Sequence, residues 1–252
     1  MKKSITTLLS ILIVTMAFAQ NYNTQGAVVF EEVMKINIQL DNMTPEMEAM
    51  IPKENRNSTI LYFNENASRY ENYESTGDAV IDEEMEGGSV KIMMSQPENI
   101  IYRDLSSNSS VEQTEFMTRV FLIESDNPVG EWKMTGNQKM ILDFPCQEAV
   151  RKDGERETKV WFTPAIPVST GPSQFFGLPG LILAMEENDG DRTIIASSVK
   201  LEEIDEEKLK KPKKGKKVTK EEFLAIVDEK TKEMGGESGG EGSQTIIMKI
   251  SQ

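Results

Sequence analysis

The chain has 252 residues, of which 42 are acidic and 28 basic, so that its formal net charge is −14. Such acidity argues against nucleic acid as a partner. The sequence contains no histidine, which excludes Ser-His-Asp and Cys-His nucleophile systems and removes the commonest zinc ligand. The single cysteine, Cys146, cannot form an internal disulfide, and the length is sufficient for one hydrophobic core to carry the fold.

The first 19 residues are typical of a secretory signal peptide. Lys2 and Lys3 supply its positive start, residues 8–18 are largely apolar, and Ala17-Phe18-Ala19 has the small residues of a cleavage site. We expect cleavage before Gln20 and export to the periplasm or cell envelope. No transmembrane segment is expected in the mature chain.

Most of the remaining chain has the pattern of short strands separated by turns. Strict alternation of apolar residues over 34–40 predicts a half-buried strand. Residues 116–123 are expected to form one longer strand. Hairpins are expected where turn-forming residues separate two strand patterns: 59–63 with 68–73, 90–95 with 100–105, 147–152 with 156–162, and 181–185 with 193–200.

Two helices interrupt this pattern. Thr44, followed by Pro45 and Glu46, can begin a short helix near the N-terminus. Thr219-Lys220-Glu221-Glu222 is a capping box, and the Phe223, Ile226 and Val227 that follow share one helical face. Glycine-rich residues 235–242 are typical of a flexible linker, and residues 245–250 are expected to form a last strand at a sheet edge.

These elements predict a mainly β fold with a single curved antiparallel sheet, half-barrel-like, a short N-terminal helix and a charged C-terminal helix. The β domain is expected over residues 20–204. Residues 205–252 are expected to hold a Lys-rich linker, the second helix, the Gly-rich linker and the terminal strand. Eight lysines lie between Lys208 and Lys220. This cluster is expected to be a solvated, disordered tether, and the alternative is a surface that binds lipopolysaccharide phosphates or an acidic partner.

The most distinctive segment is Phe176-Gly177-Leu178-Pro179-Gly180-Leu181-Ile182. Its Leu-Pro-Gly triplet suits a type II turn with Gly180 at positive φ, and the apolar residues that follow indicate a buried strand in which Leu181 and Leu183 face the core. One interpretation is a rigid turn that seats this strand. The other is a binding ridge formed by Phe176, Gly177, Leu178, Pro179 and Gly180, with Phe176 and Leu178 exposed.

These residues resemble the signature of the GLPGLI family. The approach sequence over 161–172 and Cys146-Gln147-Glu148-Ala149 are also similar to the family pattern, and the resemblance covers residues 144–191. It implies a secreted, Bacteroidota-type envelope protein, without an established activity, that is associated with TonB-dependent outer-membrane transport.

Three functions are open at this point, and none of them is enzymatic or needs a cofactor. The first is a non-catalytic adaptor that binds an envelope protein or outer-membrane transporter. The second is a carrier of an apolar ligand such as a lipid or lipoprotein acyl chain, with a cavity lined by Ile36, Ile38, Leu61, Ile92, Val120 and Leu122. The third is an exported Cu(I) binder, because Met43, Met47 and Met50 share a helical face, although packing is the ordinary role of methionines at this spacing.

Overall fold

The computed structural model describes residues 24–36, 52–74, 79–85, 88–95, 98–126, 130–154, 156–235 and 243–249. Twelve strands form one large sheet: β1 Gly26–Lys35, β2 Glu54–Phe63, β3 Ala67–Glu74, β6 Asn99–Asp104, β7 Ser109–Phe116, β8 Arg119–Asp126, β9 Lys133–Ile141, β10 Phe144–Asp153, β11 Arg156–Thr163, β12 Leu181–Glu187, β13 Arg192–Lys200 and β14 Lys216–Val218. A second sheet has three strands: β4 Ala79–Met85, β5 Gly88–Ser95 and β15 Ser243–Lys249. The 3-10 helix η2 spans Glu206–Leu209, and the helix α3 spans Lys220–Gly235.

The large sheet is open and has the strand order β14-β8-β7-β6-β3-β2-β1-β13-β12-β11-β10-β9. Neighbouring strands are antiparallel except for β14, which runs parallel to β8. β1 lies in the middle of the sheet because it pairs with β2 on one side and with β13 on the other. The mainly β class with one large curved sheet is therefore confirmed. The parallel β14 and the separate three-stranded sheet were not expected.

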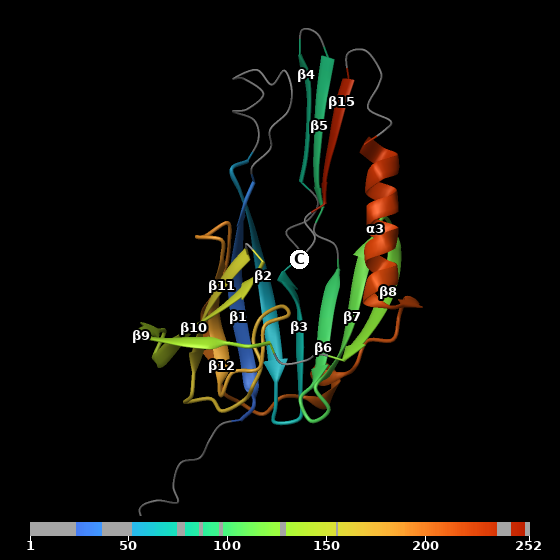
Figure 1. Cartoon of the computed structure of the whole chain (residues 1–252). Helices are drawn as coiled ribbons and strands as arrows, with labels where there is room; N and C mark the ends of the chain where they lie inside the picture. The colour runs from blue at the N-terminus through green and yellow to red at the C-terminus, as the bar shows by residue number, and fades with distance from the viewer. Residues whose placement is uncertain are drawn as a thin grey trace, which may run out of the picture.

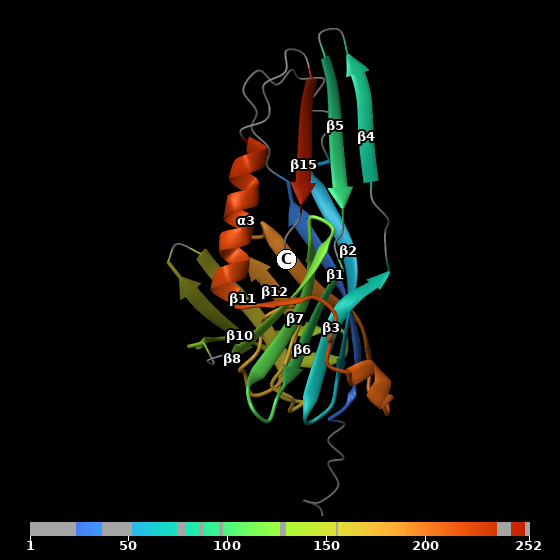
Figure 2. The same cartoon turned by 90° about the vertical axis from the view of Figure 1, so that its right-hand side faces the viewer.

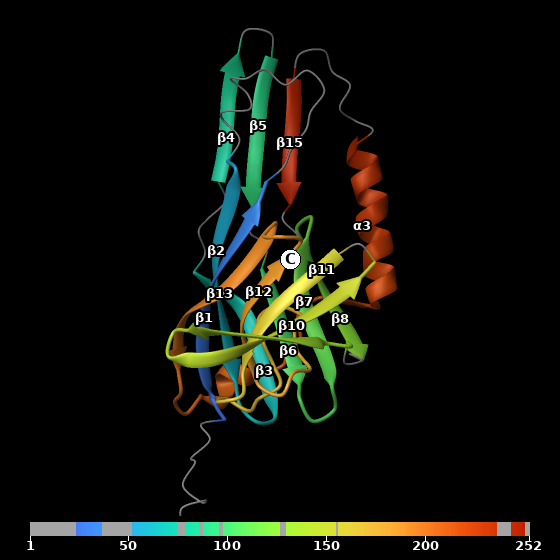
Figure 3. The same cartoon turned by 60° about the vertical axis from the view of Figure 1, so that its left-hand side comes forward.

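The sheet curls so that its second half lies against its first (Figure 3): β9, β10 and β11 cross in front of the strands around β1. The core fills the concave side between them. It is built by alternate inward residues, as on β1, where Val28, Phe30 and Glu32 point inward. The same cluster takes Leu61 from β2, Tyr70 from β3, and Val160 and Phe162 from β11.

Hairpins whose turns contain Asn, Asp or Gly form as expected. Between β2 and β3, the side-chain oxygen of Asn64 accepts hydrogen bonds from the backbone N–H groups of Asn66 and Ala67, at 2.9 and 2.8 Å. β10 pairs with β11, and β12 with β13. The turn between β12 and β13 places Asn188, Asp189 and Gly190 at positive φ, a conformation that these residue types tolerate best.

The expectation of one strand over residues 116–123 is wrong. β7 ends at Phe116, β8 begins at Arg119, and the two strands pair antiparallel. Met117 and Thr118 form the intervening turn with φ values of 50° and 64°. Two-residue hairpins of this kind need positive φ at both positions and normally use Asn or Gly. Neither Asn nor Gly is present at Met117 and Thr118, so the sequence contains no turn signal between the two strands.

The expected hairpin between residues 90–95 and 100–105 is also wrong. β5 pairs with β4 and β15, whereas β6 pairs with β3 and β7. The β4–β5 hairpin is an excursion between β3 and β6, and with β15 it extends beyond the end of the large sheet (Figures 1 and 2). The turn-forming residue types between the two strand patterns did not indicate which strand β6 joins. The predicted terminal strand is confirmed as β15, at the edge of the small sheet.

The lysine-rich segment is not a disordered tether. It includes the end of η2 and the strand β14, and its Leu209, Pro212 and Val218 are buried while the lysines remain exposed. Lys217 pairs with Glu124 at 3.3 Å, and Lys220 with Glu112 at 3.6 Å. Three apolar anchors therefore hold the segment along the edge of the sheet in spite of its charge.

The helix α3 begins at the predicted capping box. The Thr219 side chain accepts from the Glu222 backbone N–H at 3.1 Å, and the Glu222 carboxylate accepts from the Thr219 N–H at 2.9 Å. The ring of Phe223 packs edge-on against Phe121 and Phe116, with centroids 5.3 and 6.1 Å apart. The helix thus lies beside β8 (Figure 1).

Replacing Thr219 by Ala is expected to loosen α3 by about 1 kcal/mol, because one N–H group at the start of the helix loses its acceptor. Hydrogen exchange of the helix amides should become roughly five-fold faster, following the usual relation between free energy and an equilibrium constant. Thr219→Ser keeps the hydroxyl and should leave exchange unchanged. Equal protection in both variants would show that the capping box does not stabilise this helix.

Several expectations concern residues outside the described ranges. They are the signal peptide, the helix begun by Thr44 and the methionines Met43, Met47 and Met50. The expected strand at 34–40 falls on the end of β1, which starts eight residues earlier, at Gly26, and residues 37–40 also lie outside the described part. Within the described residues, no helix is both long and apolar enough to cross a membrane.

Candidate functional site

The loop from Pro164 to Gly180, which carries the signature, folds back against the start of β12. The Leu181 N–H donates to the Ile166 carbonyl at 3.0 Å, and the Ile182 N–H donates to the Thr170 carbonyl at 3.0 Å. The Thr170 hydroxyl also lies 2.7 Å from the hydroxyl of Ser68 on β3. Together these bonds fix the loop to both halves of the curled sheet.

The residues of the loop are mostly interior. Ile166, Val168, Phe175 and Leu178 belong to the main core cluster. Leu178 is only 2% exposed, so the expectation that it lies on an exposed ridge is wrong. The prediction that Leu181 and Leu183 are buried is confirmed, and the whole segment from Leu181 to Met185 is buried.

The turn at Pro179 is tighter than expected. The Gly180 N–H donates to the Leu178 carbonyl at 2.8 Å, which closes a three-residue γ-turn around Pro179 rather than the predicted type II turn. Gly180 does have positive φ, at 156°. A Cβ atom added there would stand 2.2 Å from the backbone oxygen of Thr163, so the position requires glycine for space as well as for conformation.

Of the five predicted ridge residues, three reach the surface. Phe176 and Gly177 are partly exposed and Pro179 is exposed, whereas Leu178 and Gly180 are buried. The sequence did not indicate that Leu178 is buried, because an isolated Leu between Gly177 and Pro179 has no periodic apolar neighbours that would assign it to a buried face.

The side chains that surround Phe176 could not be identified from the sequence pattern. The guanidinium of Arg103, on β6, lies 4.2 Å from the centre of the Phe176 ring. The indole N–H of Trp132 donates to the Phe176 carbonyl at 2.9 Å, and Arg151 lies over the Trp132 ring at 4.8 Å. One signal was present: Arg103 is two residues from the buried Ile101 on the same strand and therefore faces inward.

A second group of polar residues is buried where β1, β12 and β13 meet the loop. Arg192 donates to the Glu32 carboxylate at 2.6 Å, lies 3.6 Å from Glu187, and donates to the Ser173 hydroxyl at 3.5 Å. Burial alone would lower the pKa of Arg192, but its contact with Glu32 raises that pKa. Burial, and then the charge of Glu32, raises the pKa of Tyr70. This group joins the strands to the loop as an internal charged network.

Cys146 is buried, with 1% of its surface exposed. Burial raises the pKa of its thiol to about 11. Because the thiolate is the reactive form, Cys146 is unreactive at neutral pH. It acts here as a small apolar residue of the core.

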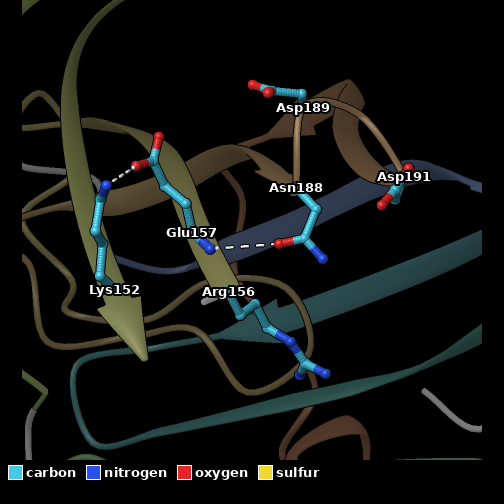
Figure 4. A pocket seen from close by; sticks show the side chains of 6 residues that line it. All are labelled: Lys152, Arg156, Glu157, Asn188, Asp189 and Asp191. Atoms are coloured by element: carbon cyan, nitrogen blue, oxygen red, sulfur yellow. Dashed lines mark hydrogen bonds and ion pairs between the residues drawn. The ribbon is translucent and has the colours of Figure 1, made fainter. Parts of the chain in front are cut away.

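Described residues line a polar and a partly apolar surface pocket. The larger, of about 610 Å³, lies between the β10–β11 and β12–β13 turns and is polar. Figure 4 shows that the Asn188 side chain accepts from the Glu157 backbone N–H and that Lys152 pairs with the Glu157 carboxylate. The polar groups at its centre therefore bond one another, which links the two hairpin tips. Within the described residues, no group of three or more His, Cys, Asp or Glu side chains is arranged to hold a metal ion.

The smaller pocket, of about 420 Å³, lies between β8 and α3. Its apolar floor is formed by Val120, Phe121 and Ile226, and its rim carries one acidic and three basic side chains, Glu229, Arg119, Lys216 and Lys230. Of the predicted carrier lining, Val120 lies here and Leu61 lies in the main core. Ile38 and the side chain of Ile92 lie outside the described part.

The comparisons with known proteins show the fold and one short family match. The model of a family described as "Protein of unknown function (Porph_ging)" matches residues 150–184, which include β11, the loop and the start of β12. No curated protein matches the chain. Two crystal structures of PNGF-II, in space groups P21 and C2, are similar over 81% of this chain, with TM-scores of 0.55 and 0.54 and identities of 15% and 17%. This chain spans about a third of the length of those chains (33% and 32%).

Proposed function

We propose that the chain is an exported, non-catalytic binding or adaptor protein of the cell envelope, of the GLPGLI type, and that the surface around Phe176 is where its partner binds. The observation that carries this proposal is the placement of the signature. The loop is anchored in the core, yet it holds Phe176, Gly177 and Pro179 at the surface.

The anchoring favours binding for an energetic reason. A partner that orders a flexible loop has to offset the conformational entropy that the loop loses, whereas a rigid loop has already lost it. The loop is bonded to β12 and β3, and Trp132 holds the Phe176 carbonyl. A partly exposed aromatic ring with a fixed backbone and two arginines nearby is the composition typical of a binding hot spot.

The proposed cellular location of the protein and the proposed kind of partner are inferred from the sequence. The N-terminal residues supply the export signal, and the net charge of −14 argues against nucleic acid. The signature lies inside the interval that the family model matches. These features support a periplasmic or envelope location, with an envelope protein or an outer-membrane transporter as the partner.

Replacing Phe176 by Ser should abolish capture of partners from envelope extracts, measured by native pull-down with mass spectrometry of proteins and lipids. The melting temperature should fall by no more than about 4 °C, because the ring is only partly buried. Tyr73→Ser is the matched control, since it removes an exposed ring from β3. Unchanged capture by the Phe176 variant, or equal loss in both variants, would contradict the proposal.

A second candidate function is the carrying of an amphiphilic ligand. It is favoured by the pocket of about 420 Å³ beside α3, in which an apolar floor and a rim with three basic side chains and one acidic one match an acyl chain with an anionic end. Lipid found bound to the purified protein, and lost on Phe121→Lys without loss of the Phe176-dependent partner, would establish this function beside the first.

A further inference from the structure

The pocket between β8 and α3 has an apolar floor and a rim that solvent reaches. Its volume of about 420 Å³ lies near the lower end of the range of about 300–1,000 Å³ that is typical of small-ligand sites. In its floor, Phe121 is buried and Ile226 is half-buried, whereas Arg119 and Lys216 on the rim are exposed. A ligand in solution can therefore reach both cations. A site of this size suits a single acyl chain better than the two chains of a phospholipid.

The alternation of the strands places the two cations beside this floor. Successive side chains of a strand point to opposite faces, so Arg119 lies on the same face of β8 as Phe121. On β14, Lys216 is opposite Phe121 in the register and shares a face with the buried Val218. Phe121 and Val218 belong to the cluster against which α3 packs. Both cations therefore lie on the side of the sheet that faces α3.

These two cations differ from their neighbour on β14 in having no partner. Lys217, one residue further on and on the opposite face, pairs with Glu124 at 3.3 Å. Neither Arg119 nor Lys216 forms an ion pair or a side-chain hydrogen bond with any other residue that the structure describes. Two positive charges at the mouth of an apolar pocket are thus available to an anionic ligand.

The acidic side chains of α3 are engaged with the helix's own cation. Lys230 bonds to Glu233, and this contact, followed by the charge of Glu229, raises the pKa of Lys230. The charge that α3 brings to the rim is therefore largely balanced within the helix. The excess of positive charge at the pocket comes from the two strand residues, in a chain whose net charge is −14.

We propose that this pocket binds a fatty acid as its free carboxylate, with the single acyl chain lying on the apolar floor. Arg119 and Lys216 hold the carboxylate. The guanidinium can donate two parallel hydrogen bonds to it, and the ammonium adds a compact positive charge. A doubly charged phosphate head is disfavoured because Glu229 stands on the same rim. This inference rests on the second candidate function, since it names the ligand and the side chains that recognise its charged end.

The test is a titration of the 15N-labelled full chain at neutral pH and constant ionic strength, followed by the backbone amide resonances of Phe121 and Ile226. The probes are sodium butanoate, hexanoate and octanoate, with 1-octanol and octyl phosphate as parallel arms. We expect octanoate to bind with a dissociation constant on the order of 0.1–1 mM. Each added CH₂ group should tighten binding by about two- to fourfold, because it is removed from water. Octanol, which has no charge, should bind roughly tenfold more weakly.

Two variants test the recognition of the carboxylate. Arg119→Gln and Lys216→Gln should each weaken octanoate binding roughly tenfold, because each removes a charge-assisted hydrogen bond, and should leave octanol binding unchanged. Both side chains are exposed, so the fold should not depend on them. Lys217→Gln is the matched control, since it removes the neighbouring lysine from the opposite face of β14. It should bind octanoate as the unaltered protein does.

Equal binding of octanol and octanoate would overturn the proposal, and so would tighter binding of octyl phosphate, affinity independent of chain length, or equal weakening in the Lys217 variant. The site and the carrier function also fail separately. Lipid that co-purifies with a protein unable to bind octanoate would keep a carrier and remove this fatty-acid site. Octanoate binding without any co-purified lipid would keep the site and remove the carrier.

Discussion

Replacing Arg192 by Met is expected to destabilise the protein by about 3–5 kcal/mol. The substitution keeps most of the side-chain volume but leaves the Glu32 carboxylate, which is 2% exposed, without its cation, and an unpaired buried charge has a cost of this size. It also removes the contact with Ser173, through which the network reaches the loop. Urea unfolding monitored by tryptophan fluorescence measures the change in the free energy of unfolding.

Two further variants separate the unpaired charge from lost packing. Glu32→Leu combined with Arg192→Met removes both members of the closest ion pair, and this double variant should be more stable than Arg192→Met alone, because the Glu32 carboxylate is no longer buried without its cation. Glu187 loses its contact with Arg192 in both variants, so it does not affect the comparison. Lys152→Met breaks an exposed ion pair with Glu157 and should have little measurable effect. If the double variant were less stable than the single one, packing rather than charge would explain the loss.

Replacing Gly180 by Ala is expected to cost about 2–6 kcal/mol, the sum of backbone strain at positive φ and of overpacking against a fixed neighbour. The new Cβ atom would meet the backbone of Thr163 at 2.2 Å. Thr163 is itself completely buried at the end of β11, so it has no room to move. Thermal and urea unfolding of the purified variant measure the loss.

The matched control is Gly136→Ala. Gly136 also has positive φ, at 85°, but no atom lies within 4 Å of the position of an added Cβ. Only the conformational part of the cost should appear there, about 1–3 kcal/mol. Similar losses at Gly136 and Gly180 would show that the contact with Thr163 relaxes freely, and that the signature glycine is required for conformation alone.

Much of the local structure could be predicted from the sequence, because its signals are local. Asn64, Gly154 and Gly190 lie in turns that form as expected, and the Thr219 capping box begins α3. Strand pairing depends on contacts distant in sequence, so the partners of β5 and β6 were assigned wrongly. The turn at Met117 and Thr118 was missed because the surrounding structure holds these two residues in a conformation that their side chains disfavour.

The sequence indicated which segment forms the candidate site, but not which side chains from other strands surround it. The signature located the loop, and the burial of Leu181 and Leu183 followed from their apolar run. Arg103 and Trp132 lie 73 and 44 residues before Phe176 in the chain, and only the curling of the sheet brings them to it. Glu32 and Arg192 are separated by 160 residues. No spacing rule connects such pairs.

The central position of β1 has a consequence for the order of folding. The backbone of Val29 accepts a hydrogen bond from Ser197, 168 residues further along the chain, so β1 has no second neighbour until nearly four-fifths of the polypeptide has been made. Closing so long a loop is slow, and topologies dominated by distant contacts fold slowly for this reason. The unpaired edge of β1 is meanwhile open to pairing with other chains. A chain that cannot complete its central strand until β13 has been made therefore keeps this strand edge unpaired for longer.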